Sequence, residues 1–403
     1  KFFTDPKNAR TYIDDIRQNN IVHNNLPDAT LGGIFPNFTP ADWNYILSYG
    51  PEFEEEPAIL WNAGNPSVKL DWKIANDPNK SNIVKYEIYR STTNNVDKTS
   101  TKITTIIDKN QITFTDSAIS SSTNIYYYRL YTYYEFGGPA DTAEAYSGLG
   151  KAVLRLYVDI SYIGGDDDGS KLKPYSDLGE GIWEVTRGTK VCVAEGVYPE
   201  TDSTLNMWNK DGFILEGGYE STSWTRDIAL NETIIDGTGL GGWNVISFSN
   251  ATGGTLDGFT VTGAFMTNDA CGVRIDRSSS IVIRNCKIIN NYRGIGMWIS
   301  PNSRVENCQI TQSSIQGIQV DRSSLDISDS VLTGNSASQL NAWTPAIDVY
   351  TGSALTAARL FVSENKGRGI AVNNISTFDV RDSVIANNLN RGFDSYNSYG
   401  KLF

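Results

Sequence analysis

Gly272-Val-Arg-Ile-Asp276 is the first of six similar segments that follow one another between Cys271 and Phe403. The other five are Gly294-Ile295, Gly317-Ile-Gln-Val-Asp321, Ala346-Ile-Asp-Val-Tyr350, Gly369-Ile-Ala-Val-Asn373 and Gly392-Phe-Asp394. Their first residues lie 22, 23, 29, 23 and 23 residues apart, and the longest interval contains an insertion from Ala337 to Pro345. A nearly fixed period of this length, built of short β-branched runs, predicts a β-solenoid in which each repeat is one coil.

Each repeat continues with two further short strands that are separated by polar corners. In the first repeat these strands are Ile281-Val-Ile283 and Cys286-Lys-Ile288. Stacked coils place equivalent residues about 4.8 Å apart, so equivalent side chains form columns. One corner column, predicted to hydrogen-bond from coil to coil through its amides, consists of Asn291, Ser313, Asn335, Asn365 and Asn388. The alternative, that asparagine is simply common in turns, accounts less well for four asparagines in register.

This pattern resembles the right-handed parallel β-helix of the pectate-lyase-like superfamily, and it is this resemblance that implies the handedness. We therefore expect an all-β protein in which residues 152–403 form a right-handed parallel β-helix with an N-terminal cap. The stretch from Leu156 to Glu200 is similar to the first part of many bacterial β-helix proteins. It includes a short helix from Leu178 to Val185 that is expected to cover the open end of the solenoid core.

Residues 56–151 contain seven short runs of alternating apolar residues, which predict an immunoglobulin-like sandwich. Leu70-Asp-Trp72, Tyr86-Glu-Ile-Tyr-Arg90 and the run from Tyr126 to Leu130 resemble the second, third and sixth strands of fibronectin type III domains. The resemblance implies a fibronectin type III-like β-sandwich that spaces or presents its neighbours.

Residues 1–55 are expected to form a short helical N-terminal segment that leads into an acidic linker. Asp5-Pro6 and Thr39-Pro40 each combine a helix-capping residue with a proline suited to the first helical position. The linker, from Pro51 to Pro57, carries four glutamates and is interpreted as a solvated charge run.

Composition and cysteine positions restrict the partners and the covalent chemistry. The net charge of -12 disfavours nucleic acid and anionic membranes, which both require a basic surface. The sequence has no apolar run long enough to form a transmembrane segment. Only 20% of residues are charged, which suits a secreted, extracellular or cell-surface bacterial protein. Cys286 and Cys308 stand at equivalent places in neighbouring repeats, so we predict stacked free thiols rather than a disulfide.

Three adjacent carboxylates, Asp166, Asp167 and Asp168, lie in a glycine-rich loop before the repeats. Carboxylate oxygens are ligands for Ca²⁺, so this loop is a candidate metal site. An acidic surface turn is the favoured alternative, because Ca²⁺ needs about six to eight oxygens and three adjacent side chains cannot all face one ion.

One outward-facing column is a candidate for substrate binding. It stands four residues after each repeat opening and consists of Asp276, Trp298, Asp321, Tyr350, Asn373 and Tyr396. Aromatic faces and carboxylates on one sheet are able to hold a sugar chain, so polysaccharide is a possible partner. Asp276 and Asp321 would lie about 9.6 Å apart, near the wide end of an inverting glycosidase pair. A solvated sheet face with a ladder of salt bridges is the favoured alternative and requires no ligand.

Enzymes of the resembling superfamily carry motifs that the repeats lack. For a hydrolase the resemblance implies an Asn-Thr-Asp, an Asp-Asp and a Gly-His-Gly on neighbouring coils. For a lyase it implies a Ca²⁺ carboxylate cluster and a basic residue. The repeats contain none of these motifs, and the only histidine is His23. The sequence therefore favours a non-catalytic structural or adhesion protein over the alternative, a protein that binds or degrades polysaccharide.

The last repeat reaches Phe403 before its coil is complete. We expect either that further chain follows or that a second copy covers this end. A head-to-tail contact that does not close would allow self-association into a filament.

Overall fold

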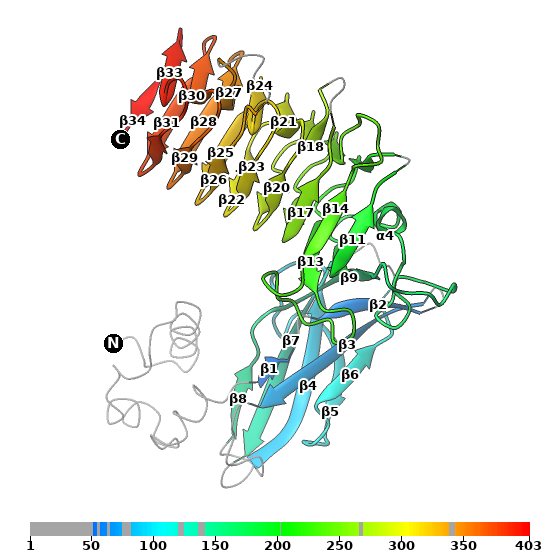
Figure 1. The fold of residues 1–403 in the computed structure, drawn as a ribbon. Coiled ribbons are helices and arrows are strands. Elements are labelled where there is room, and N and C mark those ends of the chain that lie inside the picture. Colours follow the sequence, from blue (N-terminus) through cyan, green and yellow to red (C-terminus); the bar gives the residue numbers. More distant parts are fainter. Residues whose placement is uncertain are drawn as a thin grey trace, which may run out of the picture. The chain divides into compact units, whose positions relative to one another are not determined.

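A computed structural model describes residues 51–54, 57–62, 65–74, 82–119, 125–135, 142–201, 203–265, 269–337 and 343–403 (Figure 1). The chain divides into two compact units after Leu154, close to the boundary expected after residue 151. The helices expected within residues 1–50 lie outside the described residues. Part of the expected acidic linker, Pro51–Phe53, forms a strand, and Glu52 and Glu54 are exposed.

The first unit consists of strands that follow the runs predicted from the sequence. They are β1 (Pro51–Phe53), β2 (Ala58–Asn62), β3 (Asn65–Ile74), β4 (Ile83–Ser91), β5 (Thr101–Ile106), β6 (Thr113–Asp116), β7 (Tyr126–Glu135), β8 (Thr142–Tyr146) and the first part of β9 (Gly150–Val158). Strand β3 pairs with β1, β2 and β6, while β4 pairs with β5 and β7, and β7 pairs with β8. These pairings are antiparallel, whereas β2 pairs with the first part of β9 in parallel. Strand β8 ends at Tyr146, and β9 begins four residues later, at Gly150.

Aromatic side chains fill the core of the first unit. Trp72 and Tyr86 are fully buried and meet edge to face, with their ring centroids 5.5 Å apart. Asp116 is also buried, and its Oδ2 atom accepts hydrogen bonds from Arg90 at 2.7 Å and from the Tyr128 hydroxyl at 2.9 Å. These donors offset the cost of burying the carboxylate. The fibronectin type III resemblance stays a prediction.

The second unit is a parallel β-helix in which every coil contributes strands to three sheets, called here sheets 1, 2 and 3 (Figure 1). Sheet 1 contains the second part of β9, then β10 (Lys190–Ala194), β13 (Ile214–Tyr219), β16 (Thr255–Asp257), β19 (Val282–Arg284), β22 (Ser303–Glu306), β25 (Ser324–Ser328), β28 (Ala354–Ala358), β31 (Thr377–Arg381) and β34 (Tyr399–Leu402). Sheet 2 contains β11 (Gly196–Pro199), β14 (Thr233–Asp236), β17 (Phe259–Thr262), β20 (Lys287–Ile289), β23 (Gln309–Thr311), β26 (Val331–Thr333), β29 (Phe361–Ser363) and β32 (Val384–Ala386). Sheet 3 contains β12 (Leu205–Trp208), β15 (Ile246–Ser249), β18 (Cys271–Asp276), β21 (Arg293–Trp298), β24 (Ile318–Asp321), β27 (Pro345–Tyr350), β30 (Arg368–Asn373) and β33 (Phe393–Tyr396).

The inner faces of the three sheets form the core of this unit. On sheet 3, Val273 pairs with Ile295, and Ile295 pairs with Ile318; all three side chains are fully buried. Burying one such aliphatic side chain contributes about 1.5–3 kcal/mol. The alternation of apolar and polar residues in the repeats therefore places every second side chain of a strand in the core and the others outside.

The glycines that open the repeats are explained by the contact between successive coils. A Cβ atom on Gly294 would overlap the carbonyl oxygen of Gly317 in the next coil, and one on Gly369 would overlap that of Gly392. Only a residue without a Cβ atom allows the backbones to approach this closely.

The predicted corner column forms between sheets 2 and 3, where its side chains hydrogen-bond from coil to coil. Asn335 Nδ2 donates to Asn365 Oδ1 at 3.1 Å, and Asn365 Nδ2 donates to Asn388 Oδ1 at 2.8 Å. Asn291 Nδ2 donates instead to the carbonyl oxygen of Val261 at 3.0 Å. The ladder of amides is thus confirmed for its last three asparagines.

The corner between sheets 1 and 2 is made by one residue per coil with a left-handed backbone. These residues have φ between 50 and 54° and are Asn285, Asn307, Asp329, Arg359 and Asp382. Asparagine and aspartate adopt this conformation more readily than most residues, because their short polar side chains hydrogen-bond locally. The asparagines at this corner also bond between coils, since Asn307 Nδ2 donates to Asn285 Oδ1 at 2.8 Å.

All four cysteines are buried and free, including Cys286 and Cys308. The predicted free thiols are therefore confirmed. They contribute to the core as small apolar side chains.

Helix α4 (Leu178–Trp183) precedes the first complete coil, as expected for the N-terminal cap. Asp177 begins the helix, because its Oδ1 atom accepts a hydrogen bond from the backbone N–H of Glu180 at 3.0 Å. Leu178 and Ile182 are buried, and the helix contacts β10 and β12. Within the described part of the chain, no helix has the length and apolar character needed to cross a membrane.

Candidate functional site

The predicted column lies on sheet 3, with its members in register from coil to coil. They follow one another along the sheet in the order Asp276, Trp298, Asp321, Tyr350, Asn373 and Tyr396. The structure extends this column by two coils that the sequence did not reveal. Asp276 pairs with Ser249, and Ser249 pairs with Trp208 on β12.

The members of the column differ in their exposure to solvent. Tyr396 is 73% exposed, and Asp276, Trp298, Tyr350 and Asn373 are half-buried. Asp321 is only 7% exposed; its Oδ2 atom lies 3.0 Å from Arg322 Nη2. Its neighbour on the next coil, Tyr350, is hydrogen-bonded to the side chain of Gln319. Asp321 is therefore largely shielded from solvent and paired with a neighbouring arginine.

Two arginines flank the indole ring of Trp298. The guanidinium carbon of Arg274 lies 4.2 Å from the ring centroid, and that of Arg293 lies 5.7 Å away. A cation above an aromatic ring is attracted to its electron-rich face. Arg293 is buried and also contacts Asp269 at 3.2 Å, so it is fixed in place. Trp298 is consequently held in one orientation, while Arg274 remains partly exposed beside it.

A second group of arginines lies at the far end of sheet 3. Arg368 and Arg391 bind the two carboxylate oxygens of Asp394 at 2.7 and 2.8 Å. Burial alone would raise the pKa of Asp394, but the hydrogen bonds from both arginines lower it below its usual value. The two guanidinium groups also lie 5.6 and 5.7 Å from the ring centroid of Trp343. The sheet therefore presents combined aromatic and cationic groups at two places.

Asp348 lies next to the column, on the outer face of β27, and was not predicted as a site residue. It pairs with Gln319 and Ala371 on the neighbouring strands. Burial raises the pKa of its carboxyl group, and the side chain of Gln316 donates a hydrogen bond to it at 3.3 Å. The carboxyl group of Asp348 is thus partly buried and accepts a hydrogen bond from a side-chain amide.

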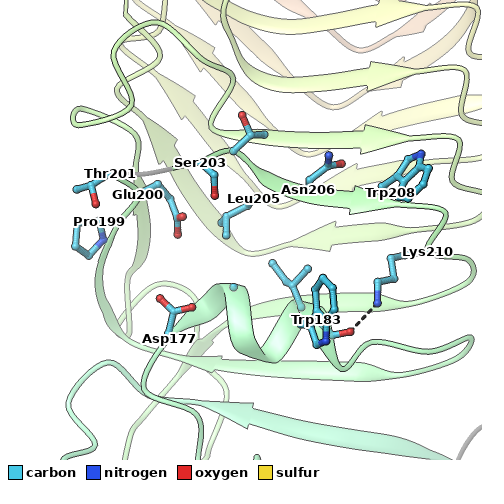
Figure 2. Close-up of a pocket in the computed structure, with 13 residues that line it drawn as sticks. Asp177, Trp183, Pro199, Glu200, Thr201, Ser203, Leu205, Asn206, Trp208 and Lys210 are labelled. Atoms are coloured by element: carbon cyan, nitrogen blue, oxygen red, sulfur yellow. Dashed lines mark hydrogen bonds between the residues drawn. The ribbon is translucent and has the colours of Figure 1, made fainter.

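A cavity of about 850 Å³ lies between α4 and β12, at the beginning of sheet 3 (Figure 2). Its lining includes two tryptophans, Trp183 on α4 and Trp208 on β12, which are 80% and 60% exposed. Lys210 also lines it and donates hydrogen bonds to the carbonyl oxygens of Trp183 and Val185 at 2.7 and 2.9 Å. This site was missed in the sequence because its residues come from a helix and from irregular coils outside the regular repeat. The two tryptophans themselves, Trp183 and Trp208, were the signal in the sequence that could have pointed to it.

Two carboxyl groups, those of Asp177 and Glu200, line the same cavity (Figure 2). Burial, together with the negative charge of Asp177, raises the pKa of Glu200 to about 8. At neutral pH the carboxyl group of Glu200 therefore mostly carries its proton and is able to donate a hydrogen bond.

The structure gives the three aspartates of the predicted calcium loop different partners. Asp166 binds Lys173 at 2.5 Å, Asp167 accepts a hydrogen bond from the Ser176 backbone at 3.2 Å, and Asp168 accepts one from the Ser170 backbone at 3.0 Å. Among the described residues, no three His, Cys, Asp or Glu side chains are grouped so as to hold a metal ion. The calcium site at Asp166, Asp167 and Asp168 stays a prediction.

Asp276 and Asp321 do not form an open pair of acids. Asp276 Oδ2 lies 3.5 Å from Arg277 Nη1, and Asp321 is buried beside Arg322. Trp298 stands between them in the column. Glycosidases require two carboxyl groups that both reach the scissile bond. The two aspartates are not arranged in this way.

Comparison with known proteins supports the fold of the second unit. Residues 223–402 match the family model described as "Right handed beta helix region". The predicted right-handed parallel β-helix is thereby confirmed. None of the curated proteins compared matches the chain in sequence.

Solved structures similar to this chain include a rhamnogalacturonan lyase, with a TM-score of 0.44 and 14% identity over 57% of this chain and 67% of that chain. Pectate lyase Pel9A has a TM-score of 0.39 and 14% identity over 62% of this chain and 78% of that chain. The enzymatically active domain of the bacteriophage CBA120 tailspike protein 2 has a TM-score of 0.38 and 11% identity over 68% of this chain and 47% of that chain. At these identities the similarity concerns the fold alone.

Proposed function

We propose that the protein is a non-catalytic extracellular or cell-surface protein that binds an acidic polysaccharide along sheet 3. The observation that carries this proposal is the column from Trp208 to Tyr396, in which aromatic rings recur on one face of eight stacked strands, exposed at Trp208 and Tyr396 and half-buried at Trp298 and Tyr350. An extended ligand suits an extended face, because equivalent residues on successive coils repeat about every 4.8 Å. Aromatic rings provide apolar area at little cost in side-chain entropy.

Guanidinium groups on this face favour an acidic ligand, although the whole chain has a net charge of -12 and Arg274 Nη2 also lies 4.0 Å from Asp276 Oδ2. Arg274 stands beside Trp298, and Arg277 on the adjoining corner is largely exposed. Guanidinium groups bind carboxylates through paired, charge-assisted hydrogen bonds. A sugar that carries a carboxylate would therefore stack on Trp298 and bond to Arg274 in a single pose.

Binding without cleavage is favoured by the state of the two carboxylates in the column. Asp321 is shielded from solvent, and Asp276 is engaged by Arg277. Attachment to a polysaccharide outside the cell would give the protein the adhesive role that the sequence favoured, and it would place the protein at the bacterial surface.

For the first unit we propose the fibronectin type III-like sandwich expected from the sequence. It is supported by the pairing of β3 with β2 and β6, by the pairing of β7 with β4 and β8, and by Trp72 in the core. Its role would be to present the β-helix. Head-to-tail self-association stays a prediction, which negative-stain electron microscopy at several dilutions tests by the presence or absence of filaments.

The proposed function is tested by affinity electrophoresis in gels that contain polygalacturonate, alginate or uncharged dextran. We expect retardation by at least one of the two acidic polymers and none by dextran, with no new reducing or unsaturated ends released in the presence or absence of Ca²⁺. Release of such ends, abolished in the double variant Asp276→Ala and Asp321→Ala, would show an enzyme instead. Equal mobility in all gels would contradict the proposal of an acidic ligand.

A further inference from the structure

The cavity between α4 and β12 has the size and composition of a site for a small polar ligand. Its volume of about 850 Å³ falls within the range of ligand pockets, roughly 300–1,000 Å³. Helix α4 forms one wall and β12 forms the opposite wall (Figure 2). Both walls are fixed, because Leu178 and Ile182 anchor the helix in the core and Lys210 bonds to the carbonyl oxygens at its end. The pocket is therefore built before any ligand arrives.

Trp183 and Trp208 offer flat apolar surfaces at this cavity. Tryptophan is usually largely buried, so two indole rings that are 80% and 60% exposed at one site call for a ligand that covers them. The C–H faces of a sugar ring pack well on such surfaces. Trp208 also begins the column of sheet 3 that continues through Ser249 to Asp276, so the cavity is continuous in register with the proposed polysaccharide face.

Asp177 and Glu200 supply complementary hydrogen-bonding groups. Asp177 uses its Oδ1 atom to cap α4, which leaves Oδ2 as an acceptor for a ligand hydroxyl. Glu200 forms no side-chain hydrogen bond or ion pair with any described residue, and in its protonated form it donates to a ligand oxygen. A polyol, whose hydroxyl groups both donate and accept, satisfies both carboxyl groups.

The same two groups disfavour a negatively charged ligand. The repulsion between Asp177 and Glu200 is already large enough to help keep Glu200 protonated. The cation that lines the cavity, Lys210, already donates to two backbone carbonyl oxygens. A ligand carboxylate would add a second negative charge beside Asp177 in a partly buried site, where like charges repel most strongly.

We propose that the cavity binds one uncharged sugar unit, which packs on Trp183 and Trp208, bonds to Asp177 and Glu200, and is selected over a uronate. This inference rests on the proposed function and deepens it. Sheet 3 would bind the acidic units of a mixed polysaccharide, while the cavity at its beginning would bind a neutral unit. The protein would thus distinguish a polymer of mixed composition from a simple polyuronate.

The test is isothermal titration of the full chain with cellobiose, maltose and diacetylchitobiose, compared with digalacturonate. At least one neutral disaccharide is expected to bind at millimolar concentration, and the Trp208→Ala variant should weaken that binding about tenfold, the loss expected for one stacked ring. Trp183→Ala serves as a second variant, because its exposed side chain is not needed for folding. Phe361→Ala, an exposed aromatic residue on sheet 2, is the matched control and should bind like the wild type.

Three results would overturn the inference: no binding of any neutral disaccharide, binding that neither tryptophan variant weakens, or digalacturonate binding that Trp208→Ala abolishes. Polysaccharide retardation that depends on Trp298, without disaccharide binding in the cavity, would reject this inference and keep the proposed function. Disaccharide binding that depends on Trp208, without polysaccharide retardation, would support the cavity site and reject the proposed function.

Discussion

Glu200 shows how its surroundings change the chemistry of one side chain in this protein. Burial and the nearby charge of Asp177 raise its pKa to about 8, and this carboxyl group has no hydrogen-bond partner among the described residues. The other charged groups of the helix and the cavity are Glu180, Glu184 and Lys210. Lys210 is occupied by backbone carbonyl oxygens, so it does not neutralise Glu200.

Replacing Glu200 by glutamine should change how stability depends on pH. In the unfolded chain this glutamate would lose its proton near the ordinary value of about 4.3. Between that pH and about 8 the folded protein therefore binds more protons than the unfolded chain, and this group lowers the free energy of unfolding as pH rises. In urea unfolding, Glu200→Gln should gain stability relative to the wild type as pH rises through this window.

Glu232→Gln provides a contrast of opposite sign. Hydrogen bonds from Lys287 and Thr260 lower the pKa of Glu232, so its contribution is present above the unfolded pKa and is lost as pH falls through the folded pKa. This variant should lose stability relative to the wild type at neutral pH. A difference between Glu200→Gln and the wild type that does not change with pH would contradict the account of Glu200.

Asn365 is the central residue of the confirmed ladder. Its side chain accepts hydrogen bonds from the backbone and side-chain N–H groups of Asn335 and donates to Leu332 and Asn388. Asn365→Ala leaves buried donors and acceptors without partners, which costs about 1–3 kcal/mol. We expect a lower midpoint of chemical unfolding, and an unchanged midpoint would show that water replaces the amide.

At the scale of the strand and coil, the positions of strands and the residues that stack were predicted most accurately where the repeat is regular. The period fixed the order of the strands from Cys271 onward and brought the column of Asp276 and Trp298 into register, because alternation and coil length together determine which residues stack. It could not predict that Asp321 is buried, since this depends on Gln319 of the same strand and on Tyr350 of the next strand. The cavity could not be predicted from the sequence either, because α4 meets β12 only in the folded chain.

Successive coils approach more closely at one glycine of a column than at the next. Replacing these two glycines by alanine should therefore lower the free energy of unfolding by different amounts. A methyl group on Gly369 would overlap the carbonyl oxygen of Gly392, whereas one on Gly392 would lie 3.3 Å from the nearest oxygen, that of Ile385. Gly369→Ala should therefore lower the free energy of unfolding by about 1–3 kcal/mol, the range for overpacking, and Gly392→Ala by much less. Equal losses in thermal or chemical unfolding would contradict the proposed reason for the repeated glycines.

At the scale of the whole molecule, a chain with a net charge of -12 presents arginines beside aromatic rings on sheet 3 and in the segments next to its strands. Long-range repulsion would slow the approach of an acidic polymer, so binding must depend on local contacts and should tolerate or even gain from added salt. This repulsion between the protein and the polymer is screened beyond about 10 Å at 0.1 M ionic strength. The proposed face therefore acts through short-range stacking and paired hydrogen bonds rather than through steering.

The most direct test of the central claim, that sheet 3 binds an acidic polysaccharide, compares Trp298→Ala with Phe361→Ala by affinity electrophoresis in polygalacturonate and alginate gels. Trp298 is the ring between Arg274 and Arg293 on sheet 3, and Phe361 is an exposed ring on sheet 2. The account predicts that Trp298→Ala weakens binding about tenfold, the loss of one stacked ring and its cation, while Phe361→Ala binds like the wild type. Equal retardation of both variants and the wild type would contradict it.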